Sequence, residues 1–257
     1  MLVVTALTFI VVMPIVLAME TLRRPPKGIA KKLGLLLVAA TGALVLAGCD
    51  STTTSKVSQA IGQSVNRASE IADRAKEFAA SAPTAPYEPI GNPSELAAAA
   101  ADAGVQLSGT QLALVRGAAG KVGVDPQLLG YVAEHELRGM DDNESDRDLF
   151  GALAGEDTSI GLTQVKVSTA LEIERQDRRD LFPPAVVNDA SETERARRLT
   201  ADDWSLLYAA AYLSLLAERY PHDGALDLAV RYTGANPAST EADQSLYDRI
   251  GEALPKE

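Results

Sequence analysis

The sequence predicts an all-α domain, and three observations support this prediction. Residues 94–257 contain several segments with apolar residues at helical spacing, and none with the alternation typical of a half-buried strand. Residues that favour helix N-termini, Ser108 and the pair Asp125-Pro126 among them, stand directly before such segments. The segment 202–220 is apolar on nearly every side, as expected of a helix in the centre of a helical core.

Capping residues and apolar spacing together predict eight helices in this domain. Ser94 is expected to cap the first, and Ser108 or Thr110 to start the second. Asp125 and Pro126 open the third. The first helix is short and Ala-rich, and the others are expected at 108–118, 126–137, Ser168–Gln176, Glu192–Leu199, Asp202–Tyr220, Gly224–Tyr232 and Asp243–Leu254.

The N-terminal region contains two apolar runs that indicate targeting rather than folded structure. The second run, 33–47, follows a cluster of five Lys and Arg residues and ends in Leu46-Ala47-Gly48-Cys49. This layout resembles a bacterial lipoprotein signal, which implies cleavage after residue 48 and acylation of Cys49. A retained transmembrane helix is the alternative, although 15 residues is shorter than the roughly 20 needed to span a bilayer. Cys49 is the only cysteine, so no intrachain disulfide competes for its thiol.

The first apolar run, Met1–Ala18, has two interpretations. It is either an additional membrane segment or an upstream extension from a misplaced start codon. We favour the extension, because the chain from Met19 onward has all the parts of a lipoprotein leader. The expected location is the cell envelope, with the protein lipid-anchored to a membrane and facing the periplasm or the wall.

Between Cys49 and the domain the sequence predicts a spacer. Residues 57–80 have apolar residues at helical spacing among polar ones, which indicates a modest amphipathic helix. Four prolines between residues 82 and 93 then indicate a semi-rigid linker and a domain boundary. The predicted organisation is therefore a leader over 1–48, a lipidated spacer and linker over 49–93, and a folded domain over 94–257.

The charge limits the possible partners. The chain has a formal net charge of −11, and without residues 1–48, which hold five basic residues and Glu20, the charge becomes −15. Such a surface argues against nucleic acid or anionic lipid headgroups as primary partners. It does not exclude an anionic glycan that is bound mainly through its sugars.

One carboxylate in the third helix lies where an apolar residue is expected. At 100° per residue, Glu136 falls in the middle of the face formed by Leu128, Leu129, Val132 and Ala133, whereas the nearby Glu134 points the opposite way. A carboxyl on an apolar face is costly to ionise, so its pKa rises unless it is paired. A general acid that works near neutral pH needs such a raised pKa. The alternative is that Glu136 reaches solvent at the helix end or pairs with Arg138.

Three motifs in order point to a family. The first is the helix start Val124-Asp125-Pro126-Gln127-Leu128-Leu129 with Glu136, and the second is the segment Ser159-Ile160-Gly161-Leu162-Thr163-Gln164-Val165 with Ser168-Thr169-Ala170. The third is the ending Tyr208-Ala209-Ala210-Ala211-Tyr212-Leu213 with 225–234. In this order, the three motifs resemble the lytic transglycosylases of the lysozyme superfamily. The resemblance covers about 107–250. It implies a lysozyme-like fold and cleavage of peptidoglycan glycan strands to 1,6-anhydromuramyl products.

The resemblance also implies roles for individual residues. Glu136 takes the place of the catalytic acid/base, Tyr232 that of the active-site tyrosine that holds the acid, and the remaining substrate-binding positions are Ser159, Gly161, Leu162 and Gln164. Three positions depart from the family pattern, namely Leu137, Thr163 and Thr233. In addition, an insertion rich in acid lies between Glu136 and Gln164, and it could supply a second carboxylate as in goose-type lysozymes. Asp157 is the candidate for that second acid, with a solvated loop residue as the alternative.

Other kinds of site find little support in the sequence. His135-Glu136 begins an H-E-x-x-H zinc pattern, but Gly139 stands where the second His is required. With two histidines and one cysteine, neither a metal site nor a Cys/His nucleophile is expected, and no cofactor is expected either. A goose-type lysozyme-like hydrolase and a non-catalytic peptidoglycan-binding lipoprotein are the alternative functions.

Overall fold

A computed structural model describes residues 59, 62–64, 66–75, 83–141, 144–176, 180–182 and 191–254. It divides into two compact units, one formed by 1–82 with 146–156 and the other by 83–145 with 157–257. Cys49, the leader and the remainder of the predicted spacer helix lie outside the described residues. Within the described ranges, no helix has the length and apolar character needed to cross a membrane.

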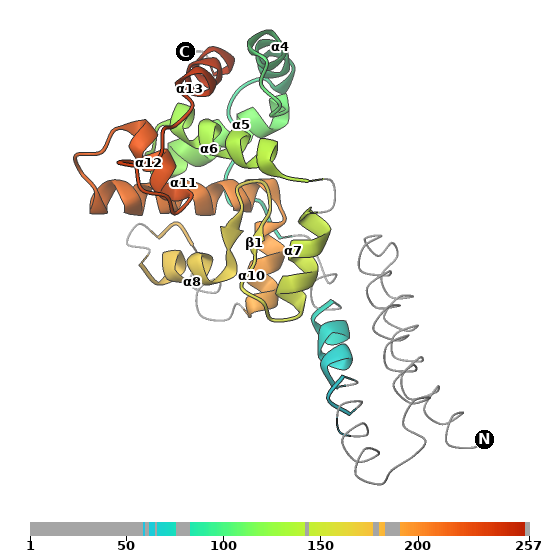
Figure 1. Cartoon of the computed structure of the whole chain (residues 1–257). Coiled ribbons are helices and arrows are strands. Elements are labelled where there is room, and N and C mark those ends of the chain that lie inside the picture. Colours follow the sequence, from blue (N-terminus) through green and yellow to red (C-terminus); the bar gives the residue numbers. More distant parts are fainter. Residues whose placement is uncertain are drawn as a thin grey trace. The chain divides into compact units, whose positions relative to one another are not determined.

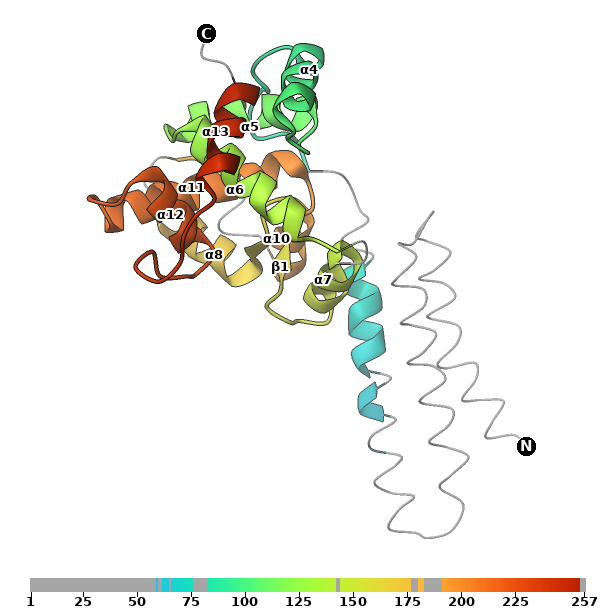
Figure 2. The same ribbon diagram turned by 45° about the horizontal axis from the view of Figure 1, so that its top comes forward.

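The larger unit is helical, which confirms the predicted all-α class. Its elements in chain order are α4 (Pro93–Ala103), α5 (Gly109–Val122), α6 (Pro126–Gly139), β1 (Ser159–Ile160), β2 (Val165–Lys166), α8 (Val167–Gln176), α10 (Glu192–Leu199), α11 (Asp202–Arg219), α12 (Ala225–Tyr232) and α13 (Gln244–Ala253). In Figures 1 and 2, α4, α5 and α13 gather at one end of this unit. At its other end lie α8, α10 and the two strands, and α11 runs between the two groups.

The central position of α11 is confirmed. It packs against α5, α6, α8, α10 and α12. Trp204, Leu207 and Tyr208 are buried together with most of the remaining side chains of this helix. A helix that is apolar on all sides needs neighbours on all sides, and these five helices supply them.

The helix starts follow from local capping. Asp125 accepts a hydrogen bond from Gln127 N at 2.9 Å, and Pro126 occupies the first position of α6, as the sequence predicts. Ser108 forms a capping box with Gln111 at the start of α5. The prediction for α4 was wrong by two residues, because the Asn92 side chain, not Ser94, caps this helix.

The structure also contains a short antiparallel hairpin that the sequence pattern did not reveal. Ser159 pairs with Lys166 and Ile160 with Val165. Each strand has only two residues, which is too short for an alternating pattern to be recognised. The hairpin leads directly into α8, and its turn contains the predicted motif residues 161–164.

Part of the predicted linker packs on the larger unit. The Trp204 indole Nε1 donates to Thr84 O at 2.8 Å, and Ile90 N donates to Ala113 O at 2.9 Å. At Glu88 the linker backbone runs so close to α5 that a Cβ added at Gly117 would lie 2.4 Å from Glu88 O. The larger unit therefore begins at Pro83, within the predicted linker.

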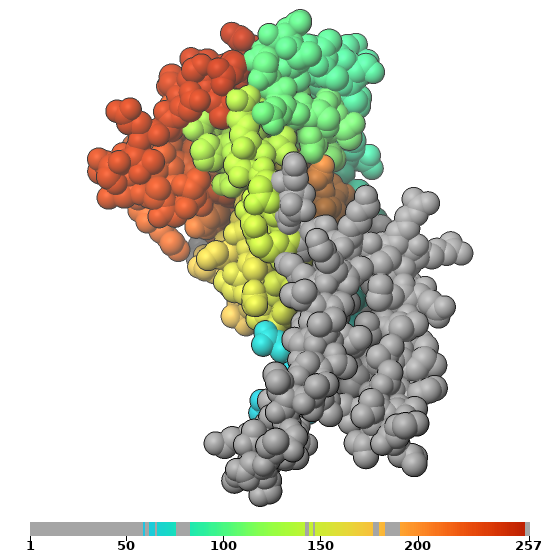
Figure 3. Space-filling model, turned by 45° about the vertical axis from the view of Figure 1, so that its right-hand side comes forward, coloured from blue at the N-terminus to red at the C-terminus, as the bar shows by residue number. Residues whose placement is uncertain are grey.

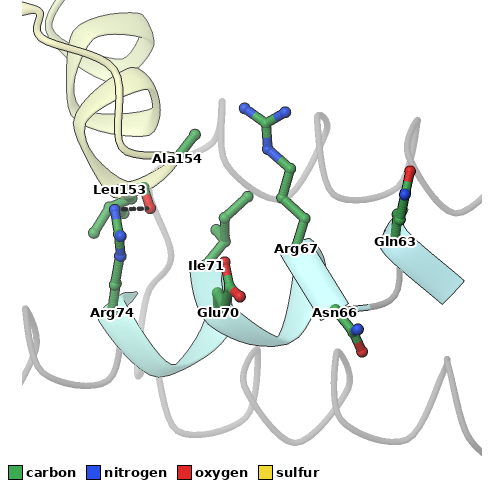
Figure 4. Close-up of a pocket in the computed structure, with 8 residues that line it drawn as sticks. All are labelled: Gln63, Asn66, Arg67, Glu70, Ile71, Arg74, Leu153 and Ala154. Atoms are coloured by element: carbon green, nitrogen blue, oxygen red, sulfur yellow. Dashed lines mark hydrogen bonds between the residues drawn. The ribbon is translucent and has the colours of Figure 1, made fainter.

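The smaller unit contains most of α7 (Glu144–Leu153), which the sequence did not predict, and a helix over 66–75 within the predicted spacer. Ile71, Ala75, Leu149 and Leu153 form its apolar cluster. Arg74 Nη1 donates to Leu153 O at 3.3 Å (Figure 4). Part of the acidic insertion is thus a helix that packs on the spacer.

Candidate active site

The larger unit has a cavity of about 500 Å³ beside the C-terminal end of α6. Five elements contribute to it: α6, the hairpin, α8, α11 and α12. In the space-filling view, part of α6 is exposed, in yellow-green, between the red C-terminal segment and the green α4 and α5 (Figure 3). The lining residues are His135, Glu136, Ser159, Gln164, Val165, Lys166, Thr169, Tyr212, Tyr232, Thr233 and Gly234.

Glu136 is partly buried in this cavity, on the same helix as the buried Leu129, Val132 and Ala133. Burial raises the pKa of its carboxyl to about 7, and the negative charge of Glu144 contributes in the same direction. No other described residue forms a hydrogen bond with this carboxyl. Glu136 is therefore a carboxylic acid that holds its proton close to neutral pH, inside a cavity.

Glu134, two residues earlier, has a structural role. Its carboxylate is fully buried and accepts hydrogen bonds at 2.9 Å from Gln106 N and Leu107 N. Arg138 Nε donates to it at 2.7 Å. The alternative in which Arg138 pairs with Glu136 is thus wrong, because the i to i+4 spacing places Arg138 on the face of Glu134.

The turn of the hairpin brings Gln164 to the cavity. Gln164 has a φ of 51°, a left-handed conformation that is uncommon for a residue with a side chain. Its Nε2 donates to Gly161 O at 3.1 Å, and its backbone N donates to the same oxygen at 3.1 Å. Non-glycine residues in this conformation gather at functional sites, where the surrounding structure holds them in place.

Gly161 and Leu162 are not among the lining residues. Gly161 has a φ of 77°, and a Cβ at this position would lie 1.8 Å from Leu199 O, so only glycine fits against α10. Its carbonyl is occupied by Gln164, and Leu162 is buried. Neither residue lines the cavity in this structure, and the substrate contact that the resemblance implies for them stays a prediction.

Tyr232 lines the cavity, but its hydroxyl is bonded to the turn. It donates to Thr163 O at 2.8 Å, and its ring packs at 5.4 Å between centroids from that of Tyr212. Burial and the charge of Glu136 both raise the pKa of Tyr232. The resemblance implies that Tyr232 holds the acid, but its hydroxyl makes no hydrogen bond to Glu136. Tyr232 lies near the acid and fixes the turn.

Thr163, one of the departures from the family pattern, secures the other side of this turn. It is fully buried, and its Oγ1 donates to Ser205 O at 3.0 Å. Its backbone N donates to Ser205 Oγ at 3.2 Å. The turn is therefore tied to both α11 and α12.

Of the two predicted site residues Ser159 and Asp157, only Ser159 lies at the cavity. Ser159 lines the cavity. Asp157 is not among the lining residues; its two carboxylate oxygens accept from Ser168 N at 2.9 Å and Ser168 Oγ at 2.7 Å, at the start of α8. These contacts are those of a helix cap.

Sequence reasoning did not select several of the lining residues. Lys166 stands opposite Ser159 in the hairpin, a relation that requires the register of the strands. His135 stacks on Tyr131, with ring centroids 6.0 Å apart and planes at 12°. Four further lining residues belong to the motifs that carry the resemblance: Thr169, Tyr212, Thr233 and Gly234. Their position in these motifs could have identified them as candidates. In the described part of the chain, no group of three or more His, Cys, Asp or Glu residues could hold a metal.

Part of the chain matches a known protein-family model. Residues 95–218 match the family model described as "T6SS, Peptidoglycan muramidase Tse3, catalytic domain". The match supports a lysozyme-like domain that degrades peptidoglycan. The matched residues include Glu136, the hairpin and nearly all of α11. They end before α12, the helix that contains Tyr232. No curated protein matched the chain.

Proposed function

We propose that this domain is a muramidase that cleaves the β-1,4 bond between N-acetylmuramic acid and N-acetylglucosamine, with Glu136 as general acid. The observation that carries the proposal is the Glu136 carboxyl in the cavity, with its pKa raised to about 7. The protonated acid donates to the glycosidic oxygen, and positive charge develops at the muramyl C1 as the bond breaks. The muramidase family match over 95–218 supports the same substrate.

The composition of the cavity favours an intramolecular second step. Glu136 is the only carboxylate among the described lining residues. After donating its proton, Glu136 takes the proton of the muramyl 6-hydroxyl, whose oxygen attacks C1 and closes a 1,6-anhydro ring. The acid is thereby regenerated without water, which is the reaction of a lytic transglycosylase.

Hydrolysis is the second candidate, and two observations favour it. The matching family is described as a muramidase. In addition, Glu144 lies close enough to raise the pKa of Glu136, so a second carboxylate is near the acid. In this reaction a water molecule attacks C1 and leaves a reducing end.

Product masses distinguish the two candidates. Purified peptidoglycan is digested with the protein, and the released muropeptides are measured by mass spectrometry. We expect anhydromuropeptides, which are lighter by one water than the corresponding reducing muropeptides. Reducing products would assign the hydrolytic reaction, and an absence of products would leave a non-catalytic wall-binding protein.

The raised pKa of Glu136 predicts the alkaline limb of the pH profile. Because the acid must be protonated before it donates, kcat/KM is expected to fall about tenfold per pH unit above a pKa near 7. The measurement is the initial rate of peptidoglycan solubilisation between pH 5 and 9. A profile that stays flat through pH 9 would contradict a carboxylic acid as proton donor.

We also propose that the mature protein is held at a membrane of the cell envelope by acylation of Cys49, and the support for this is the lipoprotein-like leader. Cells that express the chain with an alkyne fatty acid are expected to label the wild type and not Cys49→Ser. The variant is also expected to move from the membrane fraction to the soluble fraction. Equal labelling of both proteins would contradict acylation at this residue.

A further inference from the structure

Lys166 is an exposed lysine at the cavity, on the second strand of the hairpin. It is paired with Ser159 across the antiparallel strands. Directly opposed residues in such a pair project their side chains to the same face of the sheet. Both residues line the cavity, so the hairpin presents a hydroxyl and an ammonium group together.

The charges around the cavity leave this ammonium available to a ligand. Lys166 is the only Lys or Arg among the described lining residues, in a chain of net charge −11. Within the described ranges it forms no salt bridge.

We propose that Lys166 binds a carboxylate of the glycan and so favours muramyl strands over neutral β-1,4 glycans. This inference rests on the proposed function. N-acetylmuramic acid differs from N-acetylglucosamine by a lactyl group, which ends in a free carboxylate in strands without peptides. In strands with stem peptides the lactyl carboxyl is an amide, and the carboxylates belong to the peptide. Hydrogen bonds from an ammonium to either carboxylate are charge-assisted.

Binding to an inactive protein tests this inference separately from catalysis. The full chain carries Glu136→Gln, with or without Lys166→Gln, and calorimetry measures the affinity for three soluble ligands. These are peptide-free muramyl oligosaccharides, peptide-bearing muramyl oligosaccharides and neutral chitooligosaccharides. We expect Lys166→Gln to weaken binding of at least one muramyl ligand by roughly 3–10-fold, as for a partly exposed charged hydrogen bond, and to leave chitooligosaccharide binding unchanged.

The pattern of loss identifies the group that is bound. A loss confined to peptide-free strands assigns the lactyl carboxylate, and a loss confined to peptide-bearing strands assigns the stem peptide. Lys166→Arg is expected to retain most of the affinity. The exposed Lys121, in α5, provides the matched control, and Lys121→Gln is expected to have no effect.

Two results would overturn the role of Lys166: unchanged affinity for both muramyl ligands, or an equal loss for chitooligosaccharides. Failure of the proposed function is visible elsewhere, as an absence of cleavage by the protein with Glu136 intact. In that protein, Lys166→Gln is expected to raise KM for muramyl strands by a similar factor and to change kcat less than twofold, since the interaction concerns binding.

Discussion

Glu136→Gln is expected to reduce cleavage of peptidoglycan by roughly 10²–10⁴-fold, the usual contribution of a general acid. Glutamine has nearly the same shape as protonated glutamate, but it cannot give a proton to the leaving oxygen. The rate is measured as release of soluble muropeptides at pH 6, where the wild-type carboxyl is largely protonated. Retention of more than a tenth of the activity would exclude Glu136 as the acid.

The same substitution is not expected to destabilise the fold. Since the pKa of Glu136 is raised from 4.5 to about 7, the folded protein keeps a proton between these pH values that the unfolded chain has lost. Ionising Glu136 therefore costs stability as pH rises through this window, by roughly 1–3 kcal/mol when complete. Glu136→Gln removes that cost, so at pH 8 it is expected to unfold at higher urea than the wild type. Below pH 4.5 the difference is expected to vanish, because both states of the wild type are then protonated.

Glu134→Ala is expected to have the reverse effect, with a loss of stability of roughly 1–3 kcal/mol, as for a buried donor that is left without its acceptor. It leaves the buried N–H of Leu107 without its acceptor, and removes the ion partner of Arg138. Urea unfolding at pH 7 measures the loss as a shift of the midpoint with an unchanged slope.

A measurement of activity distinguishes the roles of Glu134 and Glu136, the two carboxylates of α6 discussed above. Glu134→Ala is expected to cut peptidoglycan at close to the wild-type rate per folded molecule, well below its melting temperature. Glu134→Gln, which keeps an acceptor oxygen near the two N–H groups, is expected to lose less stability. A folded Glu134→Ala without activity would contradict the structural role assigned to Glu134.

Most helices of the fold were predictable because the signals that define them are local. The helix Glu192–Leu199 was predicted with the bounds that it has. Capping residues such as Asp125 act within one turn of the helix they start. The three elements that were missed lack such signals: β1 and β2 have two residues each, and α7 begins in a highly acidic stretch.

The candidate site was predictable in part. Helical periodicity places Glu136 on the apolar face, and the motifs bring Ser159, Gln164 and Tyr232 to the same cavity. The roles of Gly161 and Asp157 could not be read in this way, because their contacts are with Leu199 O and Ser168. A motif records which residue type is present, whereas the contact depends on the packing of α8 and α10.

By itself the sequence determined the helical class, the order of the helices and the position of one acidic residue on an apolar stripe. These properties depend on residues within a few turns of each other. Only the tertiary structure decided that the Glu134 carboxylate accepts from Gln106 N and Leu107 N, that the Tyr232 hydroxyl bonds to Thr163, and that Lys166 shares the cavity with the acid. Each of these relations joins segments that are far apart in the chain. Such neighbours are set by packing, which no local pattern encodes.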